Sequence, residues 1–363
     1  MMKRITFCAL LMTLFLLLSC GSGQLQAEKL AAESKNTFLD SLVKIGHGFY
    51  EIFGVFGNAI GDALGFTAVK SGDQKSKVGE HFGKIKKGLV DTNGKLKELS
   101  DEISEAKNAN SSTIKLVEDA INSASDVIAK LIDSVTKMAS ITNDSSSIGD
   151  NVDNPPAAAE EVGVDTIIKS VSSIIEVAKK SGIEIKPGNV GNQIAVAANA
   201  TDAIAVLGGH TAKASAGAGD KLAVEVSKAD PWAMIDKIKN AKATAAAKLN
   251  AGTDNEAGAL AASNNNADAG AGAKSNADLA AAVALKAMTK GGKFSANAAD
   301  TEAVKSAAVT AVNKVLGVLD FIIRKTVSSN LDKIREAVKG IQYSETTTES
   351  AEASSTTQPA AAK

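Results

Sequence analysis

The stretch IKLVEDAINSASDVIAKLIDSVTKM, residues 114–138, decides the fold. Its apolar side chains are separated alternately by three and four residues: Ile114, Val117, Ile121, Ala124, Ile128, Leu131, Val135 and Met138. This is the a/d pattern of helices that pack along their length, and the charged residues lie off the stripe. The stretch predicts a helix about 35 Å long, which needs one or two partner helices to bury its apolar face.

Other segments supply candidate partners. Residues 78–103 and 164–178 carry similar stripes, residues 37–65 are amphipathic, and residues 304–341 predict one long C-terminal helix. The chain has only five prolines and 4% aromatic residues, and it has no strict period-two runs. We therefore predict an all-α protein, an elongated helical bundle. Long N-terminal and C-terminal helices form its base, and short helices and loops form the opposite end.

The segments between the stripes differ in composition. Residues 142–161 are polar and contain prolines, which is typical of a loop. Residues 183–300 are of low complexity, rich in Ala, Gly and Asn, so we expect them to bury little and to form short helices and loops. Residues 343–363 offer almost nothing to pack and are expected to be disordered. Residues 37–342 are thus expected to form a single α-helical domain.

The N-terminus has the layout of a bacterial lipoprotein signal peptide. Lys3 and Arg4 precede an apolar run of 14 residues, which is shorter than a membrane span. The run ends in Leu17-Leu18-Ser19-Cys20, a lipobox. We predict removal of residues 1–19 and attachment of an S-diacylglycerol group and an N-linked acyl chain, such as palmitate, to Cys20. The alternative is an ordinary signal peptide with a chance cysteine near its end.

Two or three acyl chains would hold the protein on a bilayer, because each buried methylene contributes about 0.8 kcal/mol. Cys20 is followed by Gly21-Ser22-Gly23, so residues 20–36 are expected to form a lipidated flexible tether. Cleavage would remove two basic residues and no acidic ones, leaving 38 basic and 41 acidic side chains. This balance gives no sign of a nucleic-acid partner.

The chain carries no recognisable catalytic or cofactor motif. Its three histidines, His47, His81 and His210, are far apart in sequence, and none has a neighbour at metal-ligand spacing. Ser-x-x-Lys occurs three times without the companion motifs of penicillin-binding enzymes, and no nucleophile elbow, phosphate loop or dinucleotide fingerprint is present. We expect neither an enzyme nor a bound metal or cofactor.

Two weaker signals permit a structural or a functional interpretation. Gly57, Gly61 and Gly65 form a row of small residues, either a weakened surface helix or a thin face for a helix of a second copy. Trp232 follows Asp230, a plausible N-cap, and Pro231, and we interpret it as a core anchor rather than a ligand contact.

Several stretches together resemble a known family. They are CGSGQLQAEK (20–29), FLDSLVKIGHGFYEIFGVFGNAIGDALGF (38–66), EVAKKSGIEIKPGNVGN (176–192) and, above all, DLAAAVALKAMTKGGKFS (278–295). The chain resembles the variable large protein (variable major protein) family of relapsing-fever Borrelia, which is related to the Lyme variable surface antigen VlsE. The resemblance extends from Cys20 to about residue 343.

The resemblance implies an outer-surface lipoprotein antigen, anchored to the outer membrane through Cys20 and facing outward. It implies that the termini lie near the membrane, and that distal segments, here within 183–300, vary so that host antibodies miss new versions. Ala284–Phe294 would correspond to a buried invariant helix. The alternative function is an adhesin for a host protein or glycan, for which His210, Lys213, Lys221 and Trp232 are the only hints. A homodimer is a further candidate assembly.

Overall fold

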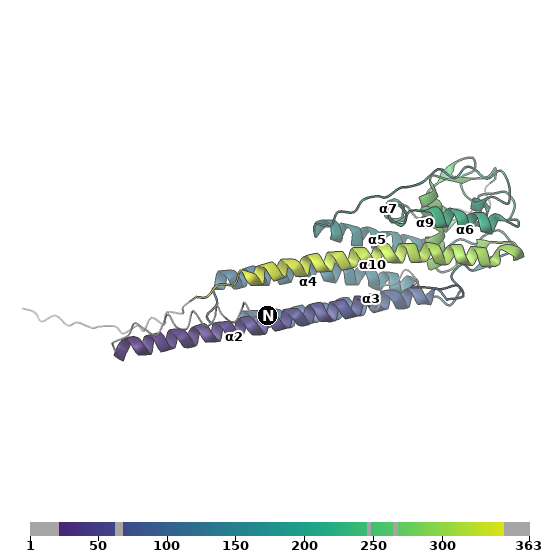
Figure 1. Cartoon of the computed structure of the whole chain (residues 1–363). Helices are drawn as coiled ribbons and strands as arrows, with labels where there is room; N and C mark the ends of the chain where they lie inside the picture. Colours follow the sequence, from purple (N-terminus) through teal and green to yellow (C-terminus); the bar gives the residue numbers. More distant parts are fainter. Residues whose placement is uncertain (1–21, 62–67, 245–247, 264–267, 345–363) are drawn as a thin grey trace, which may run out of the picture.

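Long helices lie side by side along one axis (Figure 1). The computed structural model describes residues 22–61, 68–244, 248–263 and 268–344. The long helices are α2 (Ser22–Gly61), α3 (Ser76–Ser104), α4 (Ser111–Ile141), α5 (Glu161–Lys180) and α10 (Thr301–Lys339). The prediction of an all-α elongated bundle is confirmed.

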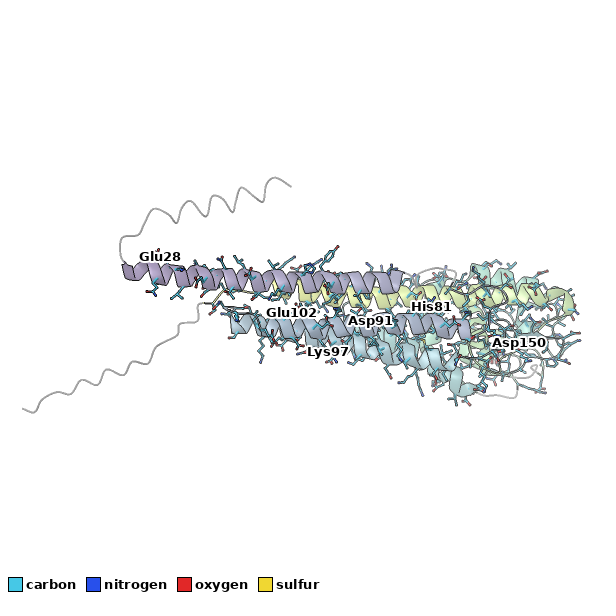
Figure 2. All side chains as sticks on the ribbon, turned by 90° about the horizontal axis from the view of Figure 1, so that it is seen from below. Glu28, His81, Asp91, Lys97, Glu102 and Asp150 are labelled. Carbon is cyan, nitrogen blue, oxygen red and sulfur yellow. The ribbon has the colours of Figure 1, made fainter. Side chains whose placement is uncertain are left out.

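One end of the bundle, called the base below, holds both ends of the described chain. There α2 begins and α10 ends (Figure 1). The ring of Phe38 in α2 lies 5.5 Å from that of Tyr343, which follows α10. The backbone N–H of Asn110, just before α4, donates to the carbonyl of Gln342. Figure 2 shows Glu28 at the base and Asp150 toward the opposite end.

The expectation of a flexible tether over residues 20–36 is wrong for its described part. Helix α2 begins at Ser22, so residues 22–36 continue the same helix that packs on α3. The segment QLQAEKLAAESK (24–35) is rich in good helix formers, and these outweigh the preceding glycines. Residues 1–21, including Cys20, lie outside the described residues.

The core of the bundle is built from the predicted stripes. In α4 the stripe residues are buried from Val117 to Met138, and Ile114 at the base is partly buried. All seven stripe residues of α3 are also buried: Val78, Phe82, Ile85, Leu89, Leu96, Leu99 and Ile103. Helix α10 is long and apolar enough to cross a membrane, but 67% of its most apolar window is buried inside the protein. It is therefore accounted for as a core helix.

Residues 183–300 form the end opposite the base, called the head below (Figure 1). The head contains η1 (Ala203–Leu207), α6 (Ala218–Lys228), α7 (Pro231–Asn240), α8 (Ala257–Ala262), α9 (Asn276–Met288) and η2 (Ala298–Asp300). Among described residues, strands are limited to two-residue pairs. β1 (Asn151–Val152) runs parallel to β4 (Phe294–Ser295), and β2 (Asp254–Asn255) runs parallel to β3 (Gly272–Ala273).

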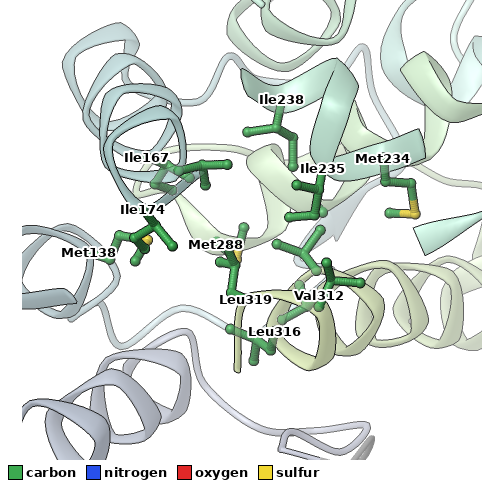
Figure 3. Close-up of a cluster of buried hydrophobic side chains, with 14 of the residues drawn as sticks. Met138, Ile167, Ile174, Met234, Ile235, Ile238, Met288, Val312, Leu316 and Leu319 are labelled. Carbon is green, nitrogen blue, oxygen red and sulfur yellow. The ribbon is translucent and has the colours of Figure 1, made fainter. Parts of the chain in front are cut away.

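The expectation that residues 183–300 bury little is wrong for the centre of the head. All thirteen residues of α9 are buried, as are those of η1. Helix α9 contacts α6, α7, α8 and α10, and Figure 3 shows Met288 among Ile235, Leu316 and Leu319. Alanine side chains let neighbouring backbones approach closely, so a helix poor in large residues is enclosed on every side.

Candidate functional site

The head is organised around residues 270–275, an extended strand-like thread that leads into α9. Ile194 and Ala273 exchange two backbone hydrogen bonds of 3.0 and 2.9 Å. On the thread's other side, the Gly272 N–H donates to the carbonyl of Thr253 at 2.9 Å. The N–H of Ala271 donates to the carbonyl of Gly209 at 2.7 Å. Three loops distant in sequence are thus fastened to one buried thread.

These fastenings join backbone to backbone. A main-chain hydrogen bond needs an N–H and a carbonyl and is indifferent to most side chains. The loops that surround the thread are largely exposed, above all residues 184–195 and 250–253. The arrangement therefore combines a fixed interior with an outer surface whose side chains carry little of the packing.

Helix α6 is held at both ends by the α10 region. The carboxylate of Asp300 accepts from the N–H groups of Gly217 and Gly219, each at 3.0 Å, at the start of α6. At its end, the ammonium of Lys314 donates to the carbonyls of Val226, Ser227 and Ala229 at 2.7–2.8 Å. Opposite charges thus satisfy the orphan groups at the two helix ends.

Two buried lysines hold the chain around the end of α9. Lys286 is fully buried, and its ammonium donates to the carbonyls of Ala157 and Ser263 at 2.6 and 3.3 Å. Lys75, just before α3, donates to the carbonyls of Thr289 and Gly292 at 2.6 and 3.2 Å. Lys286 thus ties the end of α9 to the segments around Ala157 and Ser263, and Lys75 ties the turn after α9 to the start of α3.

The electrostatic cost of these two lysines is large. Burial, together with the smaller effect of the nearby charge of Lys75, lowers the pKa of Lys286 to about 7. Burial also lowers the pKa of Lys75, against the opposing attraction of Asp144 and Asp150. Sequence reasoning missed this pair. A lysine inside the apolar run AAAVALKAM was the available signal.

The structure scatters the three histidines. His47 is exposed on α2, 3.8 Å from Glu51. His81 is buried, and its Nε2 lies 3.0 Å from Oδ1 of Asp320 in α10. The Nδ1 of His210 accepts a hydrogen bond from the N–H of Ala212. Within the described ranges, no group of three His, Cys, Asp or Glu side chains is placed to hold a metal ion.

The residues that hinted at an adhesin are engaged within the protein. Lys213 pairs with Asp153 at 2.7 Å, and Lys221 pairs with Asp202 at 3.2 Å. Trp232 is partly buried and packs against the core, in line with its interpretation as a core anchor. Its ring lies edge-on to that of Phe321, with centroids 5.6 Å apart. Each hint has a local structural partner, and the adhesin interpretation loses its support.

A surface groove with a volume of about 810 Å³ lies between residues 191–204 and α6. Two of its lysines are already paired, Lys221 with Asp202 and Lys228 with Glu225 at 3.0 Å. Its charged rim is thus largely neutralised within the protein.

The structure also locates the two weaker sequence features, the glycine row and the cap before Trp232. A Cβ added at Gly57 would meet no atom within 4 Å, Gly61 ends α2, and Gly65 lies outside the described residues. Asp230 caps α7, as predicted, by accepting from the N–H of Trp232 at 2.8 Å.

The fold and the head define a class of protein: an elongated helical scaffold that carries exposed loops at one end and both ends of the described chain at the other. Comparison with known proteins makes this specific. The chain belongs to the Borrelia lipoprotein family, whose model matches residues 49–338.

Relatives in this family match over almost the whole chain. Variable large protein 10 of Borrelia hermsii is 64% identical, covering 99% of this chain and 98% of the relative. Variable large protein 14 of the same organism is 61% identical, covering 99% of both chains. Variable large protein 4 is only 28% identical, yet the match still covers 96% of this chain.

A solved structure shares the fold. The Lyme disease variable surface antigen VlsE of Borrelia burgdorferi superposes with a TM-score of 0.67 at 27% sequence identity. The match covers 84% of this chain and 99% of that chain.

Proposed function

We propose that this chain is a surface antigen that undergoes antigenic variation, and that it evades immunity by presenting replaceable segments on a constant helical scaffold. It is a lipoprotein-family member, and its homologues are variable large proteins and a variable surface antigen. The mechanism requires no catalytic step, since it works through the identity of exposed side chains.

One observation carries this proposal: the exposed loops of the head are fastened to the buried 270–275 thread by backbone hydrogen bonds. Side chains on such loops can be exchanged at little cost to folding. An antibody, in contrast, recognises side chains. A change of side chains on this surface therefore has little effect on folding but changes what an antibody recognises.

The orientation on the cell follows from the anchor. We propose that Cys20 carries the acyl chains, with the base toward the outer membrane and the head facing outward to host antibodies. In support, α2 begins at Ser22, two residues after Cys20, and α10 also ends at the base. The head is then the part that antibodies reach first.

Exchange of loops tests the antigenic role. A chimera takes residues 184–195, 210–216 and 248–253 from variable large protein 4 and keeps the rest of this chain. Antibodies raised against this protein should bind cells that display the chimera at least about tenfold more weakly, because binding energy is concentrated in a few contact residues.

A matched control exchanges only Glu105 and Lys107, the exposed residues of the connection between α3 and α4 at the base. It should leave antibody binding to intact cells nearly unchanged, and both chimeras should keep the far-UV circular dichroism of the parent. Full antibody binding to the head chimera would contradict the proposal.

Mass spectrometry of the purified protein tests the anchor separately. Residues 1–19 should be absent, and Cys20 should carry the mass of a diacylglycerol and an acyl chain. Cys20→Ser should release the protein into the soluble fraction. An uncut leader or an unmodified cysteine would refute the anchor without touching the antigenic role.

A further inference from the structure

Helix α2 leaves an apolar stripe uncovered. Its opposite face packs on α3 through buried residues such as Phe38, Ile45 and Ile52. On the outer face, Leu39 is 55% exposed, Val43 69% and Tyr50 78%. Exposed large apolar side chains are costly in water, and here three of them share one helix face.

Glycines continue the stripe. Gly46 and Gly57 fall in the same three-and-four spacing as Leu39, Val43 and Tyr50, and a Cβ added at either glycine would meet no atom within 4 Å. No described part of this chain therefore covers the stripe. A second helix could approach it closely, because glycine leaves room between backbones.

We propose that this stripe pairs with the same stripe of a second copy of this chain, α2 beside α2 in parallel, when both copies stand on one membrane. The proposal rests on anchoring at the N-terminal end, which gives neighbouring copies the same orientation. In such a two-fold pair, residues of the seam face their own counterparts, as in a parallel coiled coil.

The charges beside the seam suit this pairing. In the parallel register set by Leu39 and Val43, Lys35 of one copy lies across from Asp40 of the other, five positions along, and both are exposed. Lys35 also lies 6.0 Å from the ring of Tyr343 in its own chain. One heptad earlier, Glu28 would meet Glu33 and repel it, so the pairing is confined to residues 35–57.

The size of this contact explains why it needs the membrane. Residues 35–57 form about 33 Å of helix, and one helix pair of that length falls at the small end of specific interfaces, about 1,200 Å² or less. Such a contact is weak between freely diffusing molecules. Tethering raises the effective concentration to the millimolar range, about where a weak contact becomes populated.

Disulfide trapping on vesicles tests the pairing. Residues 21–363 are produced with an N-terminal His tag, so neither native cysteine, Cys8 nor Cys20, is present. The tag binds nickel-chelating lipids and holds the chain at its base end, independently of native lipidation. Val43→Cys is the test variant, and Lys44→Cys, the next exposed residue of the same helix, is the matched control.

Mild oxidation on vesicles should give at least about tenfold more disulfide dimer for Val43→Cys than for Lys44→Cys, because the Cα atoms must come within about 7 Å. Without vesicles the yield should fall for both. Asp40→Lys should reduce the Val43→Cys yield, and adding Lys35→Asp should restore it. Equal yields at positions 43 and 44, or no rescue by the charge swap, would overturn the proposal. Native anchoring is judged by mass spectrometry, so the two proposals fail separately.

Discussion

Lys286 shows how one residue fixes the interior of the head. Its ammonium is enclosed at the end of α9 and finds carbonyls from two other segments, at Ala157 and Ser263. A buried ammonium without a carboxylate partner is expensive, and its pKa of about 7 reflects that cost. The hydrogen bonds of Lys286 therefore hold α9 against the segments that contain Ala157 and Ser263.

This lysine makes a pH-dependent prediction. The unfolded chain binds the Lys286 proton up to about pH 10.4, whereas the folded chain releases it above about pH 7. Between these values the unfolded state holds more protons, so the free energy of unfolding should rise with pH, by up to about 1.4 kcal/mol per pH unit. Below about pH 7 Lys286 holds its proton in both states, so it no longer makes the free energy of unfolding depend on pH.

Urea unfolding at pH 7 and pH 9 measures the effect. Lys286→Met should show a smaller rise than the parent, although the lowered pKa of Lys75 leaves part of it. Lys179→Met, which removes an exposed lysine on α5, should keep the full rise. A parent protein whose stability is the same at both pH values would refute the role given to Lys286.

His81 and Asp320 are a second residue-scale feature. They are 6% and 3% exposed and join α3 to α10 at 3.0 Å (Figure 2 labels His81). The Oδ2 of Asp320 has no hydrogen-bond partner among the described residues. His81 therefore has a structural role: its contact with Asp320 fixes how α3 packs against α10.

At the scale of elements, the apolar stripes of α3 and α4 pack against each other, and this contact is the seam meant below. Ile128 is fully buried near the middle of α4, whereas Ala129, the next residue, is exposed. The α3–α4 pair shares more contacts than the other helix pairs in the described ranges. The seam should therefore be the most sensitive part of the scaffold to a buried charge.

Ile128→Asp tests the seam. It places an unpaired carboxylate among apolar side chains and should lower the free energy of unfolding by about 4 kcal/mol or more. Ala129→Asp adds the same charge on the outer face and should change it by less than about 0.5 kcal/mol. Thermal unfolding of both variants gives the comparison. Similar destabilisation by the two would mean that the core lies elsewhere.

At the scale of the whole molecule, the protein is a long scaffold with its exposed, backbone-fastened loops at one end (Figure 1). The scaffold helices protect their backbones by internal hydrogen bonds, whereas the head loops run over the surface. Lys213, before α6, and Lys242, after α7, are both exposed. Proteases need such segments, because a bound chain must be extended.

Limited trypsin digestion of the folded protein should therefore cut first in the head, after Lys213 or Lys242. The exposed lysines Lys84 and Lys97 of α3 are controls, since they lie in packed helix and should be cut later. Mass spectrometry of the first fragments identifies the sites. First cuts within α3 would contradict the division into scaffold and head.

Much of this architecture is legible in the chain alone. The three-and-four spacing in α3, α4 and α10 predicts long helices and names the residues they bury, because periodicity is a local property of sequence. Cap signals are local as well, and Asp230 before Pro231 marks the start of α7 correctly. The lipobox at Cys20 is a local pattern of four residues as well, and lipidation there stays a prediction.

Only the tertiary structure decided what the Ala- and Gly-rich segment does. Composition predicts little burial there, yet α9 is enclosed on all sides, because small side chains admit close neighbours from five helices. The buried sites of Lys75 and Lys286 arise from segments more than 100 residues apart. Sequence thus determined which elements form and which faces are apolar. Contacts between distant segments determined which polar groups are buried, and spacing along the chain carries no record of those contacts.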